Sequence, residues 1–310
     1  MKPDAESIPN KINAPKQIRG GFDDRVVDFH LIHNQKTEDV RVFIDIIDSK
    51  PNDVILDGMD GYGAVAREIL DTTEPKGFQP EIYTVDESVV QVERARQNMP
   101  DVQEDHLVQA DIRNMPFEDK KFNTVIIKMG IHELPKSAQP DILKEVSRVL
   151  KPGGKFVTWE LSFPDEASQV IFQDIIRKKD ELAGFNRLVE NRYFPRQDEL
   201  LKLFADAGFE KVEVAHKVDA KLSMRVREQE LVSKERKQIM SEEGTLTAEK
   251  EKELAELGKE RCDQLVAFIK EYMSRVPESI RKQMEYYESE NDTFLSPNKD
   301  IILGYKPESV

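Results

Sequence analysis

Residues 53–71 read DVILDGMDGYGAVAREILD, and this stretch decides the fold class. It begins with a short apolar run, continues through a glycine-rich turn at residues 58–63 and opens directly into a helical pattern. A strand, a tight loop and a helix in this order are typical of the first unit of an open parallel sheet. Ligands of such sheets bind at the carboxyl ends of the strands, so we expect a binding site beside this loop.

The alternation of strand-like and helical segments continues along the chain. Further strands are predicted over residues 81–86, 106–111, 122–130, 155–161, 209–219 and 299–306. Strands that alternate with helices of about 10 to 15 residues predict an α/β fold, in which a doubly wound parallel sheet is covered on both faces.

Composition divides the chain into three parts. Residues 1–21 mix charge, Pro and Asn and are predicted to form a flexible tail. Residues 22–220 and 291–310 carry the sheet pattern, whereas residues 221–290 are rich in Glu, Lys, Arg and Gln and are predicted to form a helical insertion between the last two strands. The apolar face of this insertion must be buried, so we expect either a lid over the site or a dimerisation arm that makes a homodimer.

Charge and cysteine content exclude several classes of protein. Lys and Arg total 46 against 60 for Asp and Glu, which gives a net charge of −14 and disfavours nucleic acid and anionic lipid as partners. The sequence has no apolar run of the roughly 20 residues that a transmembrane helix needs. Cys262 is the only cysteine, which rules out an intramolecular disulfide. We therefore expect a cytoplasmic protein.

The glycine-rich turn is compatible with two ligands. Residues 61–66 (GYGAVA) fit the dinucleotide pattern G-x-G-x-x-A, but Asp57 and Asp60 would repel a pyrophosphate at close range. The amino-acid end of S-adenosylmethionine carries an ammonium as well as a carboxylate. Backbone N–H groups around Gly61 and Gly63 would bind the carboxylate while Asp57 pairs with the ammonium, so the acids favour this second ligand.

Acidic residues also close the next two predicted strands. Asp86 follows EIYTV, where a carboxylate accepts hydrogen bonds from both ribose hydroxyls. Asp111 follows HLVQA, where it accepts one from the exocyclic amine of adenine, and the N–H of Ile112 is placed to donate to a ring nitrogen. Carboxylates at the ends of three consecutive strands face one crevice, which is a more specific pattern than the glycines alone.

Four segments resemble the class I S-adenosylmethionine-dependent methyltransferases: VILDGMDGYG, YTVDES, QADIRNMPFEDKKFNTVI and EVSRVLKPGGKFVTWEL. The last two resemble the small-molecule branch typified by the ubiquinone and menaquinone C-methyltransferases. The resemblance implies a seven-stranded, mostly parallel sheet with an antiparallel final strand, and S-adenosylmethionine as cofactor. One position departs from the family's D-x-G-x-G-x-G motif, because Met59 occupies the first glycine position and Gly58 lies one residue early.

These arguments define a set of expected cofactor-binding residues, of which Lys128 and Met129 are assigned by resemblance alone. The set comprises Asp57, Gly58, Met59, Gly61, Gly63, Asp86, Glu87, Ser88, Asp111, Ile112, Lys128 and Met129.

Methyl transfer from a sulfonium is a direct displacement, which needs alignment and the exclusion of water but no metal. The best candidate for a general base is His132 in KMGIHELP, whereas Glu133 is expected to be a solvated acid. Glu160, Tyr193 and His30 are the candidates for contact with the acceptor, although an aromatic core position is an equal alternative for Tyr193. The loop KMGIHELP lacks the Asn/Asp-Pro-Pro-aromatic run of enzymes that methylate bases.

The sequence thus favours methyl transfer from S-adenosylmethionine to a small molecule, with the methylated atom left open among carbon, nitrogen and oxygen. A non-catalytic S-adenosylmethionine-fold scaffold that uses the insertion for partner contacts is the alternative. A nicotinamide-dependent oxidoreductase is a weaker third hypothesis, which the acids of the loop disfavour.

Overall fold

The computed structural model describes residues 22–25, 36–219 and 221–308. The predicted tail at residues 1–21 and the candidate His30 lie outside the described residues.

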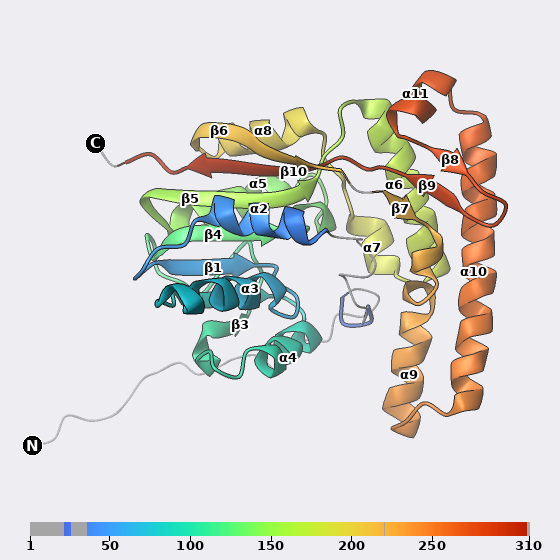
Figure 1. Ribbon diagram of the computed structural model, residues 1–310, viewed down its shortest axis with the longest axis horizontal. Coiled ribbons are helices and arrows are strands. Elements are labelled where there is room, and N and C mark those ends of the chain that lie inside the picture. Colours follow the sequence, from blue (N-terminus) through green and yellow to red (C-terminus); the bar gives the residue numbers. More distant parts are fainter. Residues whose placement is uncertain (1–21, 26–35, 220, 309–310) are drawn as a thin grey trace, which may run out of the picture.

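A single seven-stranded sheet forms the centre of the molecule, in the order β3-β2-β1-β4-β5-β10-β6 (Figure 1). Its strands are β1 (Val54–Gly58), β2 (Glu81–Asp86), β3 (Leu107–Gln109), β4 (Phe122–Lys128), β5 (Leu150–Leu161), β6 (Glu210–Val218) and β10 (Lys299–Tyr305). The first five strands pair in parallel, and β10 runs antiparallel to both β5 and β6. The predicted α/β sheet with its antiparallel final strand is therefore confirmed.

Helices cover both faces of this sheet because neighbouring strand residues point to opposite faces. One face is covered by α2 (Thr37–Ile47), α3 (Ala64–Thr73) and α4 (Val89–Asn98), and the other by α5 (Gln139–Val149) and α8 (Gln197–Asp206). On β1, Ile55 packs with the first group of helices and Leu56 with the second, and both are fully buried. The same division separates Ile301 from Ile302 on β10.

A second group of elements follows β6 and precedes β10 along the chain. It contains β7 (Leu222–Ser223), α9 (Ser233–Glu243), α10 (Ala248–Ser274), α11 (Glu278–Gln283), β8 (Tyr287–Glu288) and β9 (Thr293–Leu295). Figure 1 shows α9 and α10 as a hairpin beside the sheet. Thr247 caps α10, as its side chain accepts a hydrogen bond from the Lys250 N–H. The small sheet β7-β9-β8 was not predicted, because its strands are too short to show an alternating pattern.

The apolar face of α10 is buried within the same chain. Cys262, Leu265 and Ile269 pack in one cluster with Phe172 and Ile175 of α6 (Glu166–Leu182). This contact meets the requirement of the apolar stripe without a second copy of the chain. The burial of this stripe therefore does not distinguish a lid from a dimerisation arm.

Gly258 allows α10 to approach the backbone that precedes α9. A Cβ at this position would lie 2.8 Å from the Glu228 carbonyl oxygen, closer than ordinary contact. We predict that Gly258→Ala lowers the free energy of unfolding by up to about 2 kcal/mol, because overpacking against a backbone oxygen costs as much as about 3 kcal/mol and the helix-propensity gain is roughly 1 kcal/mol.

Urea unfolding measures this effect. Glu256→Ala, at an exposed position of the same helix, is the matched control and should change stability by no more than about 0.5 kcal/mol. A Gly258→Ala variant as stable as the wild type would contradict the close approach.

Candidate functional site

A cavity of about 280 Å³ lies at the carboxyl ends of β1, β2 and β4. We call one side of it the acidic half, which is lined by Asp57, Asp60, Asp86, Glu87 and Asp111. We call the other side the basic half, which is lined by Arg25, Lys179, Arg192, Arg227 and Lys299. The glycine loop after β1 supplies the first acids, whereas α6, α7 (Asn186–Asn191) and the segment after β7 supply most of the cations.

Asp57 and Asp60 form a buried pair of carboxyls in the glycine loop. Asp57 accepts a hydrogen bond of 3.0 Å from the Ala66 N–H at the start of α3. Burial raises its pKa to about 6, and burial together with Asp57 raises the pKa of Asp60 well above its usual value. Neither carboxyl oxygen of Asp60 accepts a hydrogen bond from an N–H or hydroxyl group of the described residues. A ligand ammonium fits this place, because its N–H groups would donate hydrogen bonds to these oxygens and its positive charge would compensate the carboxylates.

Asp86 ends β2 and is held by two backbone N–H groups. Its oxygens accept hydrogen bonds of 2.9 Å from Gly61 and 2.8 Å from Ser88. Burial nevertheless raises the pKa of this carboxyl to about 6. The Gly61 N–H, which was expected to bind the cofactor's carboxylate, donates to Asp86 in this structure. Each oxygen of Asp86 retains a second acceptor position for a ligand hydroxyl.

Most of the remaining expected cofactor residues line the cavity, whereas Gly58 and Gly63 do not. Asp111 pairs with the Arg113 guanidinium at 2.6 Å, and this pairing outweighs burial and lowers the pKa of the carboxyl. Ile112 is buried, and its Cδ1 would lie 2.8 Å from a Cβ placed on Gly58. The Ser88 side chain caps α4, and Glu87 forms an exposed ion pair of 3.0 Å with Arg187.

His132 lies in the cavity wall after β4, and both of its ring nitrogens contact carboxylates. Nδ1 faces Glu160, and Nε2 lies 3.1 Å from an oxygen of Glu133. Burial alone would lower the pKa of the imidazole, but the two carboxylates outweigh it and raise the pKa to about 9. His132 is therefore buried in the cavity wall, where its two carboxylate neighbours favour the charged form of the ring.

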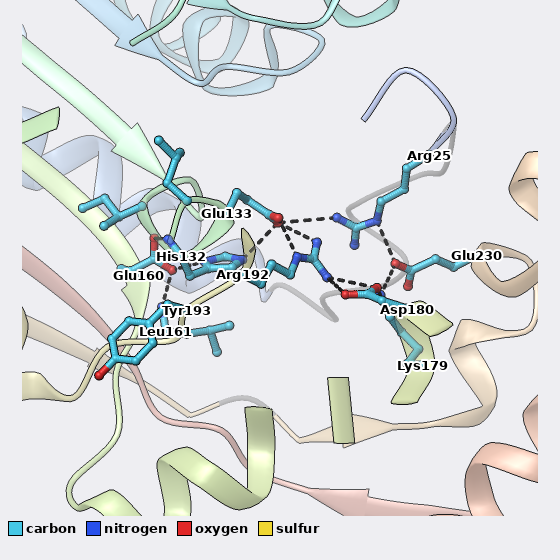
Figure 2. A network of polar contacts seen from close by, with 12 residues as sticks. Arg25, His132, Glu133, Glu160, Leu161, Lys179, Asp180, Arg192, Tyr193 and Glu230 are labelled. Carbon is cyan, nitrogen blue, oxygen red and sulfur yellow. Dashed lines mark hydrogen bonds and ion pairs between the residues drawn. The ribbon is translucent and has the colours of Figure 1, made fainter. Parts of the chain in front are cut away.

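Glu133 is buried rather than solvated, so that expectation is wrong. Its oxygens accept hydrogen bonds of 2.5 and 2.6 Å from Arg192, and Arg25 lies 3.7 Å away. Arg192 also donates to Asp180 at 2.9 Å. Figure 2 shows Glu133, Arg192 and Asp180 pointing toward one another; Asp180 lies in α6, Arg192 directly follows α7, and Glu133 lies after β4. The pKa of Glu133 is lowered, because Arg192 and His132 outweigh the effect of burial.

A second centre of the same network is the buried carboxylate of Glu230. It contacts Lys179 at 2.6 Å, Arg25 at 2.7 Å and Arg227 at 3.0 Å, and Lys179 also contacts Asp180 at 2.7 Å. These partners come from distant parts of the sequence, with a separation of 205 residues between Arg25 and Glu230.

Two of the residues expected to contact an acceptor occupy other positions. Glu160 is fully buried behind His132, and it lines no part of the cavity. The Tyr193 hydroxyl donates to Glu199 at 2.8 Å, and Tyr193 is likewise absent from the cavity wall. In both cases a hydrogen-bond partner on another element holds the side chain. This partner is His132 for Glu160 and Glu199 for Tyr193.

A model of the ubiE/COQ5 methyltransferase family matches residues 25–220, which is more than half of the chain. The chain belongs to this family. The resemblance found in the sequence is thus confirmed.

Individual relatives differ in the extent of their similarity. A demethylmenaquinone methyltransferase of Staphylococcus saprophyticus is 32% identical over 151 residues, which cover 44% of this chain and 63% of the relative. The ubiquinone/menaquinone biosynthesis C-methyltransferase UbiE of Ectopseudomonas mendocina is 28% identical over 184 residues, 56% of this chain and 71% of the relative. The chain thus spans less than two thirds of the staphylococcal relative.

A solved structure shows the same fold. The YcgJ protein of Bacillus subtilis superposes with a TM-score of 0.62 at 16% identity, and the match covers 88% of this chain and all of the other.

The departure of this family member at Met59 has a local explanation. Met59 adopts the left-handed conformation that favours glycine (φ 56°), and its N–H donates to the Val85 carbonyl at 2.7 Å. A Cβ on Gly130 would lie 2.9 Å from both Cβ and Sδ of Met59. The missing side chain of Gly130 therefore provides the space that the Met59 side chain occupies, and the loop retains its turn.

The buried cations of this family member were mostly missed by sequence reasoning, although α6 carried a usable signal. The apolar stripe through Phe172, Ile175 and Ile176 continues at helical spacing to Lys179 and Asp180. Charged residues on an otherwise apolar face predict buried partners, which here are Glu230 and Arg192.

Two negative findings apply to the described residues alone. They contain no group of three or more His, Cys, Asp or Glu side chains that could hold a metal ion, and none of their helices has the length and apolar character to cross a membrane.

The Glu133–Arg192 pair yields a stability prediction. Arg192→Ala would leave Glu133 and Asp180 buried without their main partner, and we expect a loss of about 3–5 kcal/mol in the free energy of unfolding. Arg196→Ala is the matched control, because Arg196 forms an exposed pair with Asp198 and should contribute less than about 1 kcal/mol. Urea unfolding of both variants decides the point, and equal losses would show that the buried pair contributes no more than a surface one.

Proposed function

We propose that the chain transfers the methyl group of S-adenosylmethionine to a small-molecule acceptor. The observation that carries this proposal is the set of carboxylates, Asp57, Asp86 and Asp111, that line one cavity beside the glycine loop. Membership of the ubiE/COQ5 family supports it, as do relatives whose names state demethylmenaquinone or quinone C-methyl transfer.

The acidic half is the place proposed for the cofactor. Asp57 and Asp60 would pair with its ammonium, Asp86 with its ribose hydroxyls, and Asp111 with Ile112 would contact its adenine. The raised pKa values of Asp57 and Asp86 support this arrangement, because both carboxyls lie in a wall that lacks full positive compensation. When bound there, S-adenosylmethionine supplies an activated methyl group, and the residues of the chain align the acceptor and exclude water.

His132 is proposed to accept the acceptor's proton at Nε2. Because Glu160 and Glu133 raise the pKa of the ring to about 9, the ring must first release its Nε2 proton to solvent. Nε2 must then exchange its contact with Glu133 for one with the acceptor. Glu133 would keep its pairing with Arg192 during this exchange. Glu160 would act as a positioning residue, because it holds Nδ1 and thereby orients the ring.

The segment after β6 is proposed to act as a lid. Leu222 and Arg227 both line the cavity, which supports this role over a dimerisation arm.

The net charge of −14 supports a small-molecule acceptor over nucleic acid, and the single buried Cys262 supports a cytoplasmic location.

Removal of the ribose acceptor tests the cofactor site. We expect Asp86→Ala to weaken S-adenosylmethionine binding at least tenfold, since each hydrogen bond to a charged group contributes about 1.5–3 kcal/mol. Isothermal titration measures the affinity, with Asp101→Ala as a control whose exposed carboxylate pairs with Arg67. Unchanged affinity in Asp86→Ala would remove Asp86 from the site.

Transfer itself is tested with a labelled methyl group. Incubation of the protein with methyl-labelled S-adenosylmethionine and a low-mass cell extract should move the label to a small molecule that separates from S-adenosylmethionine on chromatography, and should release S-adenosylhomocysteine. Tight binding without release would support the non-catalytic scaffold instead.

The charge state of His132 gives a pH prediction that needs no acceptor. NMR titration of the ring should show a midpoint near pH 9, with the charged form below it. Glu160→Gln removes one of the carboxylates that stabilise the imidazolium, so the midpoint should move to lower pH. Glu145→Gln, which alters a pair with Arg148, is the control and should leave the midpoint in place. A wild-type midpoint at or below the ordinary histidine value would contradict the ion pairs around His132.

A further inference from the structure

Arg227 is a buried guanidinium in the wall of the basic half. Its side chain is 3% exposed, and it lies in the short turn between β7 and α9. Among the described residues its guanidinium makes a hydrogen bond from Nη1 to Glu230 at 3.0 Å, whereas its buried Nε has no partner. An unpaired N–H of a buried cation is costly unless a ligand satisfies it.

The partner of Arg227 is shared with other cations. The Glu230 carboxylate also contacts Lys179 at 2.6 Å and Arg25 at 2.7 Å. Lys179 and Arg25 share Asp180 and Glu133 with Arg192, so four cations of this network face three carboxylates. Burial is the main reason that the pKa of Arg227 is lowered, and Glu230 does not fully compensate for it. The surroundings of Arg227 therefore lack negative charge.

A second cation of the cavity wall responds to Arg227. Lys299 at the start of β10 is 2% exposed, and its pKa is lowered to about 7 by burial and then by the charges of Lys128 and Arg227. Lys299 and Arg227 both line the cavity.

Apolar side chains line the cavity together with these cations. They include Met129, Leu161, Phe172, Ile176 and Leu222. A ligand that fits here combines an apolar body with an anionic group.

We propose that the methyl acceptor is an apolar molecule with a carboxylate, which Arg227 binds while the body lies against Leu161, Phe172 and Leu222. The identity of this ligand as the acceptor rests on the proposed function. A carboxylate matches the planar donor fork of a guanidinium and brings the single negative charge that this wall lacks. The turn after β7 thus supplies the group that selects the acceptor.

The test compares probes that share a phenylbutyl body and differ in the head group. The dissociation constants of 4-phenylbutyrate, 4-phenylbutyramide and 4-phenylbutyl phosphate are measured by NMR titration, with and without S-adenosylhomocysteine. We expect the acid to bind the wild type about tenfold more tightly than the amide. Equal binding of acid and amide would overturn the proposal, and tighter binding of the phosphate would overturn the choice of carboxylate.

Arg227→Met assigns the preference to its residue. It keeps an apolar stem and leaves Glu230 paired with Lys179 and Arg25, and we expect it to bind acid and amide equally. Arg225→Met is the matched control, because Arg225 pairs with Glu228 outside the cavity wall, and it should retain the tenfold preference. If Arg227→Met does not fold, Arg227→Lys replaces it and should reduce the preference. A full preference in the folded Arg227 variant would overturn the assignment.

S-adenosylmethionine affinity, measured in the same proteins, separates the two proposals. Arg227→Met should bind S-adenosylmethionine like the wild type. Failure of the wild type to bind it would overturn the proposed function, while a preference for the acid would still support an anion site at Arg227.

Discussion

The buried ion pair between Glu133 and Arg192 joins the loop after β4 to the helices that close the cavity. The two hydrogen bonds of 2.5 and 2.6 Å hold Glu133 against α7, and the adjacent His132 is fixed between Glu133 and Glu160. Charges in an interior are tolerated only where opposite charges compensate for them. His132 is therefore linked through Glu133 and Arg25 to Glu230, which belongs to a segment distant in sequence.

The two halves of the cavity have opposite electrostatic imbalances. In the acidic half, burial raises the pKa values of Asp57 and Asp86 to about 6, and in the basic half it lowers that of Lys299 to about 7. Both shifts move the groups toward neutrality, as expected where charges of one sign lie together in a poorly solvated wall. The proposed ligands, a cofactor with an ammonium and an acceptor with a carboxylate, would each supply the missing charge.

Several features of the fold and site were predictable because their causes are local. The run before Asp57 and the glycines at 61 and 63 define a strand and a turn, and the structure has both, with left-handed backbone at the glycines. Asp86 ends β2 and Ser88 caps α4, each determined by residues within a few positions. The way in which the glycine loop accommodates Met59 could not be predicted from its neighbours in sequence. The space for the Met59 side chain is left by Gly130, which is distant in sequence.

By itself, the sequence determined the order of strands and helices, the glycine loop and the placement of acids at the carboxyl ends of neighbouring strands. These features depend on periodicity, turn residues and the direction of parallel strands, which act over short stretches of chain. Only the tertiary structure decided that Glu133 is buried, that Tyr193 lies outside the cavity wall and that Arg227 faces the cavity. Their surroundings come from segments up to 205 residues apart, and the pairing of buried charges over such distances leaves no local pattern.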